Sequence, residues 1–231
     1  MKKKIIIHCA IILLCAIIFS LLVSFANADL EISSLFYLPE KRWFMGRDMP
    51  WYFLYHYGNI PAIILSAGGF LVFLLSFFQK RLTKYRKIGL FFAALMVLGP
   101  GLVVNAAFKD HWGRPRPADI VNFGGEQKYQ HFWEKGKAGE GKSFPSGHAS
   151  VGFYLMTPFF FLMPARKRMA WAFLGLGIIY GLFMGTGRII QGGHFFTDVV
   201  WSGVFIYLTG YLLGHAFKFN QTNDHAGDKR I

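Results

Sequence analysis

Six long apolar runs constrain the fold of this chain more than any other feature of its sequence. A helix needs roughly 20 apolar residues to cross a bilayer, within a range of about 17–25. A backbone in lipid must also satisfy its own hydrogen bonds. Hydrophobic residues make up 54% of the 231 residues, so the sequence predicts an all-α integral membrane bundle of six transmembrane helices. The predicted spans are Ile5–Phe25, Ile60–Phe78, Ile88–Phe108, Gly147–Met163, Ala170–Thr186 and Thr197–Phe217.

Lys and Arg residues predict the orientation of these spans. The short segments Gln79–Lys87 and Pro164–Met169 are rich in Lys and Arg and contain no acidic residue. Because cytoplasmic loops are enriched in positive charge, we place both segments, and with them the N-terminus, in the cytoplasm. The ends of spans three and five and the starts of spans four and six then lie together at the outer face.

Composition divides the chain into four parts. The start, with Ala26-Asn27-Ala28 before Asp29, resembles a signal peptide, but its apolar run is longer than the usual run of about 7–15 residues and favours a retained helix. The next part is rich in aromatic and basic residues that suit the headgroup level, either as a surface anchor or as a wall of a lipid entrance. The parts are 1–26, a first transmembrane helix or signal-like segment; 27–59, the aromatic interfacial segment on the periplasmic side; 60–217, the core; and 218–231, a polar cytoplasmic tail.

The net charge of +13 has ordinary causes in a membrane protein. Basic cytoplasmic loops and contacts with anionic lipid both require positive residues, so we expect no nucleic-acid partner. The two cysteines, Cys9 and Cys15, lie in the first apolar run, which argues against a disulfide framework or a Cys-based zinc site. The sequence predicts no oligomeric state.

Four cationic residues converge on the outer face from separate helix ends. They are Lys109, Arg114, Arg116 and Arg188. Such a group would repel itself unless an anion lay within it, and guanidinium groups match phosphate oxygens in bidentate geometry. The pattern predicts an anion site, in which Arg114 either binds the anion, pairs with an acidic residue or flanks the site.

The sequence Pro145-Ser146-Gly147-His148 stands where the fourth predicted span begins. Proline suits a first helical turn, and Ser143 is placed to cap the helix. Free backbone N–H groups at a helix N-terminus bind phosphate, and glycine permits the close approach of an anion. A helix cap without a ligand is the alternative for this sequence on its own.

His194 and Asp198 are four residues apart and share one helical face. A carboxylate bonded to one imidazole nitrogen fixes the tautomer and leaves the other nitrogen free to attack. His148, His194 and Asp198 could instead be metal ligands. The neighbouring Lys and Arg residues would repel a cation, so the residues favour an anion site without a metal.

Together these patterns resemble the type-2 phosphatidic acid phosphatase (PAP2) family. The matching sequences are Lys-x6-Arg-Pro from Lys109 to Pro117, Pro-Ser-Gly-His from Pro145 to His148, and Arg-x5-His-x3-Asp from Arg188 to Asp198. Their order and their positions relative to the six spans also match. The family usually has serine before the third-motif arginine, where this chain has Gly187, so another donor or a backbone contact is expected there.

The resemblance implies a mechanism that needs no cofactor and no metal. His194 would attack phosphorus and form a phosphohistidine, Asp198 would orient and charge it, and His148 would protonate the leaving oxygen and later activate water. The residues implied to bind the phosphoryl group are Lys109, Arg116, Arg188, Pro145, Ser146 and Gly147, with Arg114 beside them.

The resemblance therefore predicts a phosphatase that acts on a membrane lipid. Residues 109–125 look most like the bacterial branch that dephosphorylates lipid A, which would place the chain in the bacterial inner membrane with its site facing the periplasm. Undecaprenyl pyrophosphate, phosphatidylglycerophosphate and glucose-6-phosphate phosphatases share the motifs and are alternatives, as is transfer of the phosphate to an acceptor alcohol. A transporter or lipid-binding protein is the non-enzyme alternative, but its polar residues should lie near mid-helix rather than at helix ends.

Overall fold

The computed structural model describes residues 2–219, and within this range the chain is helical with no β-strand. The predicted all-α fold is therefore confirmed for these residues, while most of the predicted tail, 220–231, lies outside them. The α-helices are α1 (Lys2–Phe25), α2 (Ala28–Ser34), α3 (Trp51–Tyr57), α4 (Ile60–Leu75), α5 (Arg86–Met96), α6 (Asp110–Trp112), α7 (Gly147–Phe153), α8 (Thr157–Leu162), α9 (Lys167–Ile190) and α10 (Phe196–Ala216). Shorter or irregular helical turns are η1 (Lys80–Tyr85), η2 (Val97–Lys109), η3 (Pro117–Asp119), η4 (Val121–Phe123) and η5 (Tyr154–Met156).

Within the described part of the chain, five helical stretches are long and apolar enough to cross a membrane. They are α1, Trp51–Leu75, Lys80–Asp119, α9 and α10. The fourth predicted span is instead divided into α7, η5 and α8. Pro158, in the first turn of α8, has no N–H to donate to the preceding turn, which favours a break in the helix there. This is the architecture of a multi-pass membrane protein with a broken central segment.

The broken segment α7–η5–α8 forms the core of the bundle. Phe153, Tyr154, Met156 and Phe160 are each at most 5% exposed. A helix that lies against protein on all sides tolerates interruptions because its neighbours can satisfy the freed backbone groups. The outer helices α1 and α4, by contrast, have few buried residues.

Glycines on one face of α9 let the central elements approach closely. Gly177, Gly181 and Gly185 recur every fourth residue, and a Cβ on any of them would overlap a neighbour: Met156, the Phe153 ring and Val199, respectively. Small residues at this spacing allow helix backbones to pack closely in membranes. The spacing is visible in the sequence and fixes α9 against η5, α7 and α10.

A proline disturbs the helix that leads to the predicted site. Pro100 lies inside the π-helical stretch η2, where it cannot donate a backbone hydrogen bond and its ring crowds the preceding turn. The side-chain amide of Asn105 donates to the Pro100 carbonyl at 2.7 Å. The irregular stretch ends at Lys109, and π-helical segments are frequent at functional sites.

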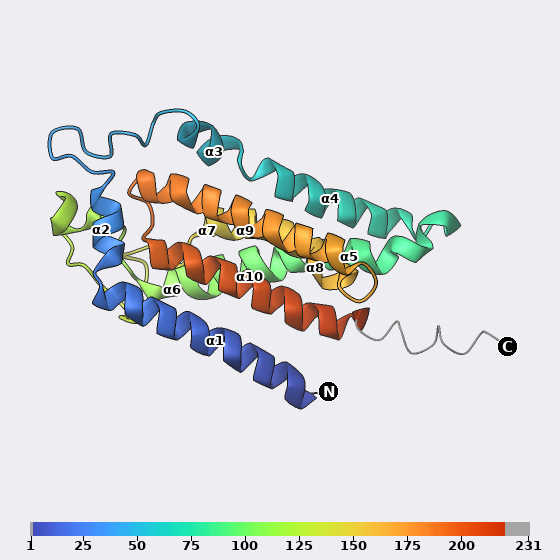
Figure 1. The fold of residues 1–231 in the computed structure, drawn as a ribbon. Helices are drawn as coiled ribbons and strands as arrows, with labels where there is room; N and C mark the ends of the chain where they lie inside the picture. The colour runs from blue at the N-terminus through green and yellow to red at the C-terminus, as the bar shows by residue number, and fades with distance from the viewer. Residues whose placement is uncertain (1, 220–231) are drawn as a thin grey trace.

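The two ends of the bundle are formed by different elements (Figure 1). The start of α1, the basic turn η1 and the turn between α8 and α9 lie at one end. The elements α2, α3 and α6, the start of α7 and the connection from α9 to α10 lie at the other. All three predicted motifs are therefore at the end opposite the basic loops.

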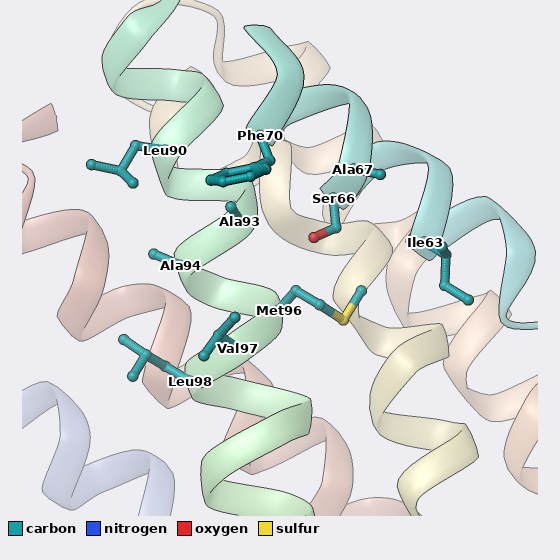
Figure 2. A pocket seen from close by; sticks show the side chains of 10 residues that line it. All are labelled: Ile63, Ser66, Ala67, Phe70, Leu90, Ala93, Ala94, Met96, Val97 and Leu98. Carbon is teal, nitrogen blue, oxygen red and sulfur yellow. The ribbon is translucent and has the colours of Figure 1, made fainter. Parts of the chain in front are cut away.

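An apolar hollow of about 640 Å³ lies between α4 and α5, away from these motifs. Figure 2 shows the side chains that line it, which are apolar apart from the Ser66 hydroxyl. Its lining residues are Ile63, Ser66, Ala67, Phe70, Leu90, Ala93, Ala94, Met96, Val97 and Leu98. No predicted site residue lines it, so the chemistry lies elsewhere.

We expect Gly181→Ala to destabilise the fold by about 1–3 kcal/mol, because the new methyl group would overlap the Phe153 ring in a filled core. Thermal unfolding of the purified protein in detergent measures this. Gly175→Ala is the matched control, since an added Cβ there meets nothing within 4 Å. Equal melting temperatures for the two variants would contradict the close helix contact.

Candidate active site

Backbone hydrogen bonds connect the three predicted motifs at one end of the bundle. The Ser143 N–H donates to the Arg114 carbonyl at 3.0 Å, and the Ser146 N–H donates to the Asp198 carbonyl at 3.3 Å. The first connects the segment after α6 to the approach to α7, and the second connects the start of α7 to α10. The structure thus brings together the segments that the sequence placed at one face.

His194 lies between α9 and α10 and is only 1% exposed. Its Nδ1 lies 2.5 Å from the carbonyl oxygen of Ser143 and 3.8 Å from Oδ2 of Asp198. A carbonyl only accepts, so Nδ1 carries the proton and Nε2 keeps a free lone pair. The Ser143 carbonyl is therefore the nearest acceptor of the Nδ1 proton, and the Asp198 carboxylate, which was expected to orient the imidazole, is the second group on the same side of the ring.

The surroundings of His194 keep its ring neutral. Burial lowers the pKa of His194 to about 4; the Asp198 carboxylate raises the pKa, and the cations Arg188 and Lys109 lower it further. An imidazole that is unprotonated near neutral pH has the lone pair that a nucleophile or base requires.

Asp198 is fully buried and its carboxylate is surrounded by donors. Its Oδ2 accepts hydrogen bonds from the Ser143 hydroxyl at 2.5 Å and from the Phe195 N–H at 2.7 Å. Its Oδ1 accepts from Nη1 of Arg114 at 2.6 Å. These bonds hold the carboxylate in one orientation beside His194.

Arg114 forms ion pairs with acidic residues rather than facing an anion site. It is 0% exposed, and its Nη2 donates to Asp29 at 2.8 Å while its Nη1 donates to Asp198. Its Nε donates to the Gln130 carbonyl at 2.9 Å. The prediction that Arg114 binds substrate is corrected accordingly, because its donors are already used by two carboxylates and a carbonyl.

The cap of α7 is Ser146, not Ser143 as expected from the sequence. The Ala149 N–H donates to the Ser146 hydroxyl oxygen at 3.4 Å, and the helix begins at Gly147. Pro145 therefore precedes the cap instead of occupying the first turn. Ser143 instead contacts two of the predicted catalytic residues: its hydroxyl donates to Asp198, and its carbonyl accepts from His194.

Gly147 allows Lys109 to reach the N-terminus of α7. A Cβ at Gly147 would lie 2.9 Å from Oδ1 of Asn105 and 3.3 Å from Nζ of Lys109. The first N–H groups of a helix have no intrahelical acceptor, and the Lys109 ammonium lies beside the first residue of α7. Asn105, which belongs to none of the three motifs, lies beside Gly147 as well.

Arg116 and Arg188 carry unused donors. The Nε of each is buried and has no hydrogen-bond partner among residues 2–219. Both guanidinium groups interact electrostatically with Lys109. The guanidinium of Arg188 packs against Gly193, where an added Cβ would overlap it. Buried donors without acceptors are costly, and a phosphate would supply the missing acceptors.

Tyr55 joins this group from the aromatic segment. Its ring stacks on His148 with centroids 5.0 Å apart at 18°, and the Arg188 guanidinium lies 4.7 Å from its centroid. His148 also interacts electrostatically with His194. The sequence left the segment as an anchor or a wall of the entrance, and the position of Tyr55 favours the wall.

The metal alternative finds no support in the donor set. No group of three or more His, Cys, Asp or Glu side chains in the described range could hold a metal ion. Both Asp198 oxygens already accept hydrogen bonds from protein donors, and the adjacent cations are Lys109 and Arg188.

Comparisons with known proteins agree with the motifs. The PAP2 superfamily model matches residues 89–222. A lipid A 4'-phosphatase of Francisella tularensis subsp. novicida (strain U112) is 38% identical over 192 residues, which cover 82% of this chain and 86% of the relative. A lipid A 4'-phosphatase of Rhizobium etli is 34% identical over 126 residues, 53% of this chain and 46% of that protein. No solved structure matches the chain. The chain belongs to the PAP2 superfamily.

Proposed function

We propose that this chain is a membrane phosphatase that hydrolyses the 4'-phosphate ester of lipid A. The PAP2 match and the relative that shares 38% identity over 82% of the chain support a lipid phosphatase. The observation that carries the proposal is the pair of unpartnered, buried Nε atoms of Arg116 and Arg188, both interacting with Lys109 near His194. That arrangement fits a phosphate group beside a nucleophile.

The reaction would proceed through a phosphohistidine. Nε2 of His194 attacks phosphorus and the bond from phosphorus to the lipid oxygen breaks. His148, protonated once the bound phosphate offsets the neighbouring cations, gives that oxygen a proton. His148 then takes a proton from water, the resulting hydroxide attacks phosphorus, and the bond from phosphorus to nitrogen breaks. Free phosphate leaves, and both histidines return to their starting states.

The cations and the start of α7 would stabilise the transition state. Lys109, Arg116 and Arg188 would hold the three non-bridging phosphoryl oxygens, together with the backbone at Gly147. Pro145 and Ser146 would shape that turn. No metal is needed in this scheme because the positive charge comes from the protein.

We further propose that the site faces the periplasm of a bacterial inner membrane. The basic turns at η1 and between α8 and α9 lie at the opposite end of the bundle (Figure 1), which favours a cytoplasmic position for them. The divided segment α7–η5–α8 would then count as a sixth crossing.

In His194→Gln, phosphate release from lipid A should fall on the order of a thousandfold or more, because the nucleophile is lost. The assay is phosphate release by purified protein from lipid A, undecaprenyl pyrophosphate and phosphatidylglycerophosphate. His111→Gln, at an exposed histidine, is the matched control. EDTA should not alter the wild-type rate. Turnover retained by His194→Gln would refute the nucleophile, and fastest release from another lipid would refute the substrate.

The orientation can be tested with single cysteines in a background in which Cys9 and Cys15 are replaced by alanine. Ala138→Cys and Lys84→Cys are both exposed and lie on the site side and the basic side, respectively. In cells with a permeabilised outer membrane, an impermeant thiol reagent should label position 138 alone. Labelling of position 84 alone would reverse the topology.

Gly187→Ser should be tolerated and should tighten substrate binding. An added Cβ meets only Trp51 at an ordinary 3.4 Å, and the hydroxyl would add a donor next to Arg188. One such bond is worth about 0.5–1.5 kcal/mol, so KM should fall about twofold to tenfold. Gly187→Ala fills the same space without a donor and should leave KM unchanged. A rise in KM for both variants would contradict this expectation and would show that phosphate binding requires the absence of a side chain at position 187.

A further inference from the structure

Asp29 is a fully buried carboxylate that the mechanism above does not use. It lies in α2, near the end of the bundle that holds the site. Its Oδ1 accepts from the Thr197 N–H at 2.9 Å, and its Oδ2 accepts from the Thr197 hydroxyl at 2.6 Å and from Nη2 of Arg114 at 2.8 Å. A buried charge with this many donors is held in one place.

The first role of Asp29 is to cap α10 from a distant part of the chain. The residue at the N-cap position of α10 is Phe195, which has no side-chain oxygen to accept from the first N–H groups. Asp198 accepts from the Phe195 N–H, and Asp29, 168 positions before Thr197, accepts from the Thr197 N–H. Both carboxylates lie at the positive end of the helix dipole.

Its second role is to bind one of the two terminal nitrogens of the Arg114 guanidinium, so that Asp198 binds only the other. An isolated Arg–carboxylate pair commonly forms two parallel N–H···O bonds to one carboxylate. Here Nη1 donates to Oδ1 of Asp198 at 2.6 Å and Nη2 donates to Asp29. Oδ2 of Asp198 therefore stays with the Ser143 hydroxyl and the Phe195 N–H, on the side that faces Nδ1 of His194 at 3.8 Å.

Because the single cation Arg114 pairs with two carboxylates, Asp29 and Asp198, a net negative charge remains beside the imidazole of His194. The buried group of Arg114, Asp29 and Asp198 has a formal charge of −1 when both carboxylates are ionised. An imidazole that becomes phosphorylated gains positive charge, which this group would stabilise.

We propose that Asp29 is a positioning residue for the phosphatase reaction, acting through Arg114 to hold Asp198 against the Nδ1 side of His194. This inference rests on the proposed function. It differs from a purely structural role because it requires an effect on kcat that depends on Asp198.

The test compares Asp29→Asn with wild type for phosphate release from lipid A. Asparagine keeps the shape and one acceptor oxygen, and Arg114 keeps Asp198 as its ion partner, so the chain should fold. We expect kcat to fall about tenfold to a hundredfold, by analogy with the loss seen when partners that orient metal-binding side chains are removed, with KM within twofold. Glu31→Gln, at an exposed carboxylate on the same helix, is the matched control and should keep wild-type kcat.

A double-mutant cycle separates positioning from folding. If Asp29 acts through Asp198, adding Asp29→Asn to Asp198→Asn should lower kcat by no more than about twofold further. Unchanged kcat in Asp29→Asn, or losses that multiply in the double variant, would overturn the proposal. A wild type that releases no phosphate from any lipid would instead overturn the proposed function.

Thr197→Val provides a second variant if Asp29→Asn fails to fold. It removes the hydroxyl that donates to Asp29 and accepts from Arg114 while leaving every charge in place. We expect a threefold to tenfold loss of kcat, on the order of one neutral hydrogen bond, with the same dependence on Asp198. A wild-type kcat in this variant would also overturn the proposal.

Discussion

The ion pairs of Arg114 with Asp29 and Asp198 are the interaction on which the rest of the site depends. All three side chains are buried, and removing one partner of a buried ion pair typically costs about 3–5 kcal/mol because the other charge is left unpaired. The pairs join α2, the segment after α6 and the start of α10. Ser143 extends the same network to His194, so the position of the imidazole depends on chain segments far apart in the sequence.

Local spacing made part of this site predictable from sequence. Apolar runs indicate the long helices, and the motif spacing places His194 and Asp198 close together in the chain. The predicted shared helical face is wrong, because His194 precedes the start of α10 at Phe196. Ser143 connects the two side chains instead, through its carbonyl to His194 and its hydroxyl to Asp198. Arg114 was recognised as a cation that could pair with an acid, but nothing in the spacing identified Asp29, 85 residues away, as its partner. The contact of the Ser143 carbonyl with His194 was equally unpredictable, because every residue has a backbone carbonyl and the residue pattern does not indicate which one is used.

Hydropathy also could not reveal how the core is divided. The run from Gly147 to Met163 has the composition of a span, yet the chain forms α7, η5 and α8 there because Pro158 interrupts it. The glycines of α9 leave room for the bulky side chains of this broken segment to pack closely against the helix. A sequence average measures how apolar a run is, whereas the break depends on one proline and on neighbours that arrive from elsewhere in the chain.

Charges of both signs surround His194. Asp198, with Asp29 behind it, lies on the Nδ1 side, whereas the cations Lys109 and Arg188 oppose protonation of the ring. Before substrate binds, burial and these cations keep the imidazole neutral. A bound phosphate would offset the cations, so the positive charge that develops on the phosphorylated ring would meet mainly the carboxylates. In the proposed reaction, the same arrangement would therefore keep the free imidazole unprotonated and stabilise its phosphorylated form.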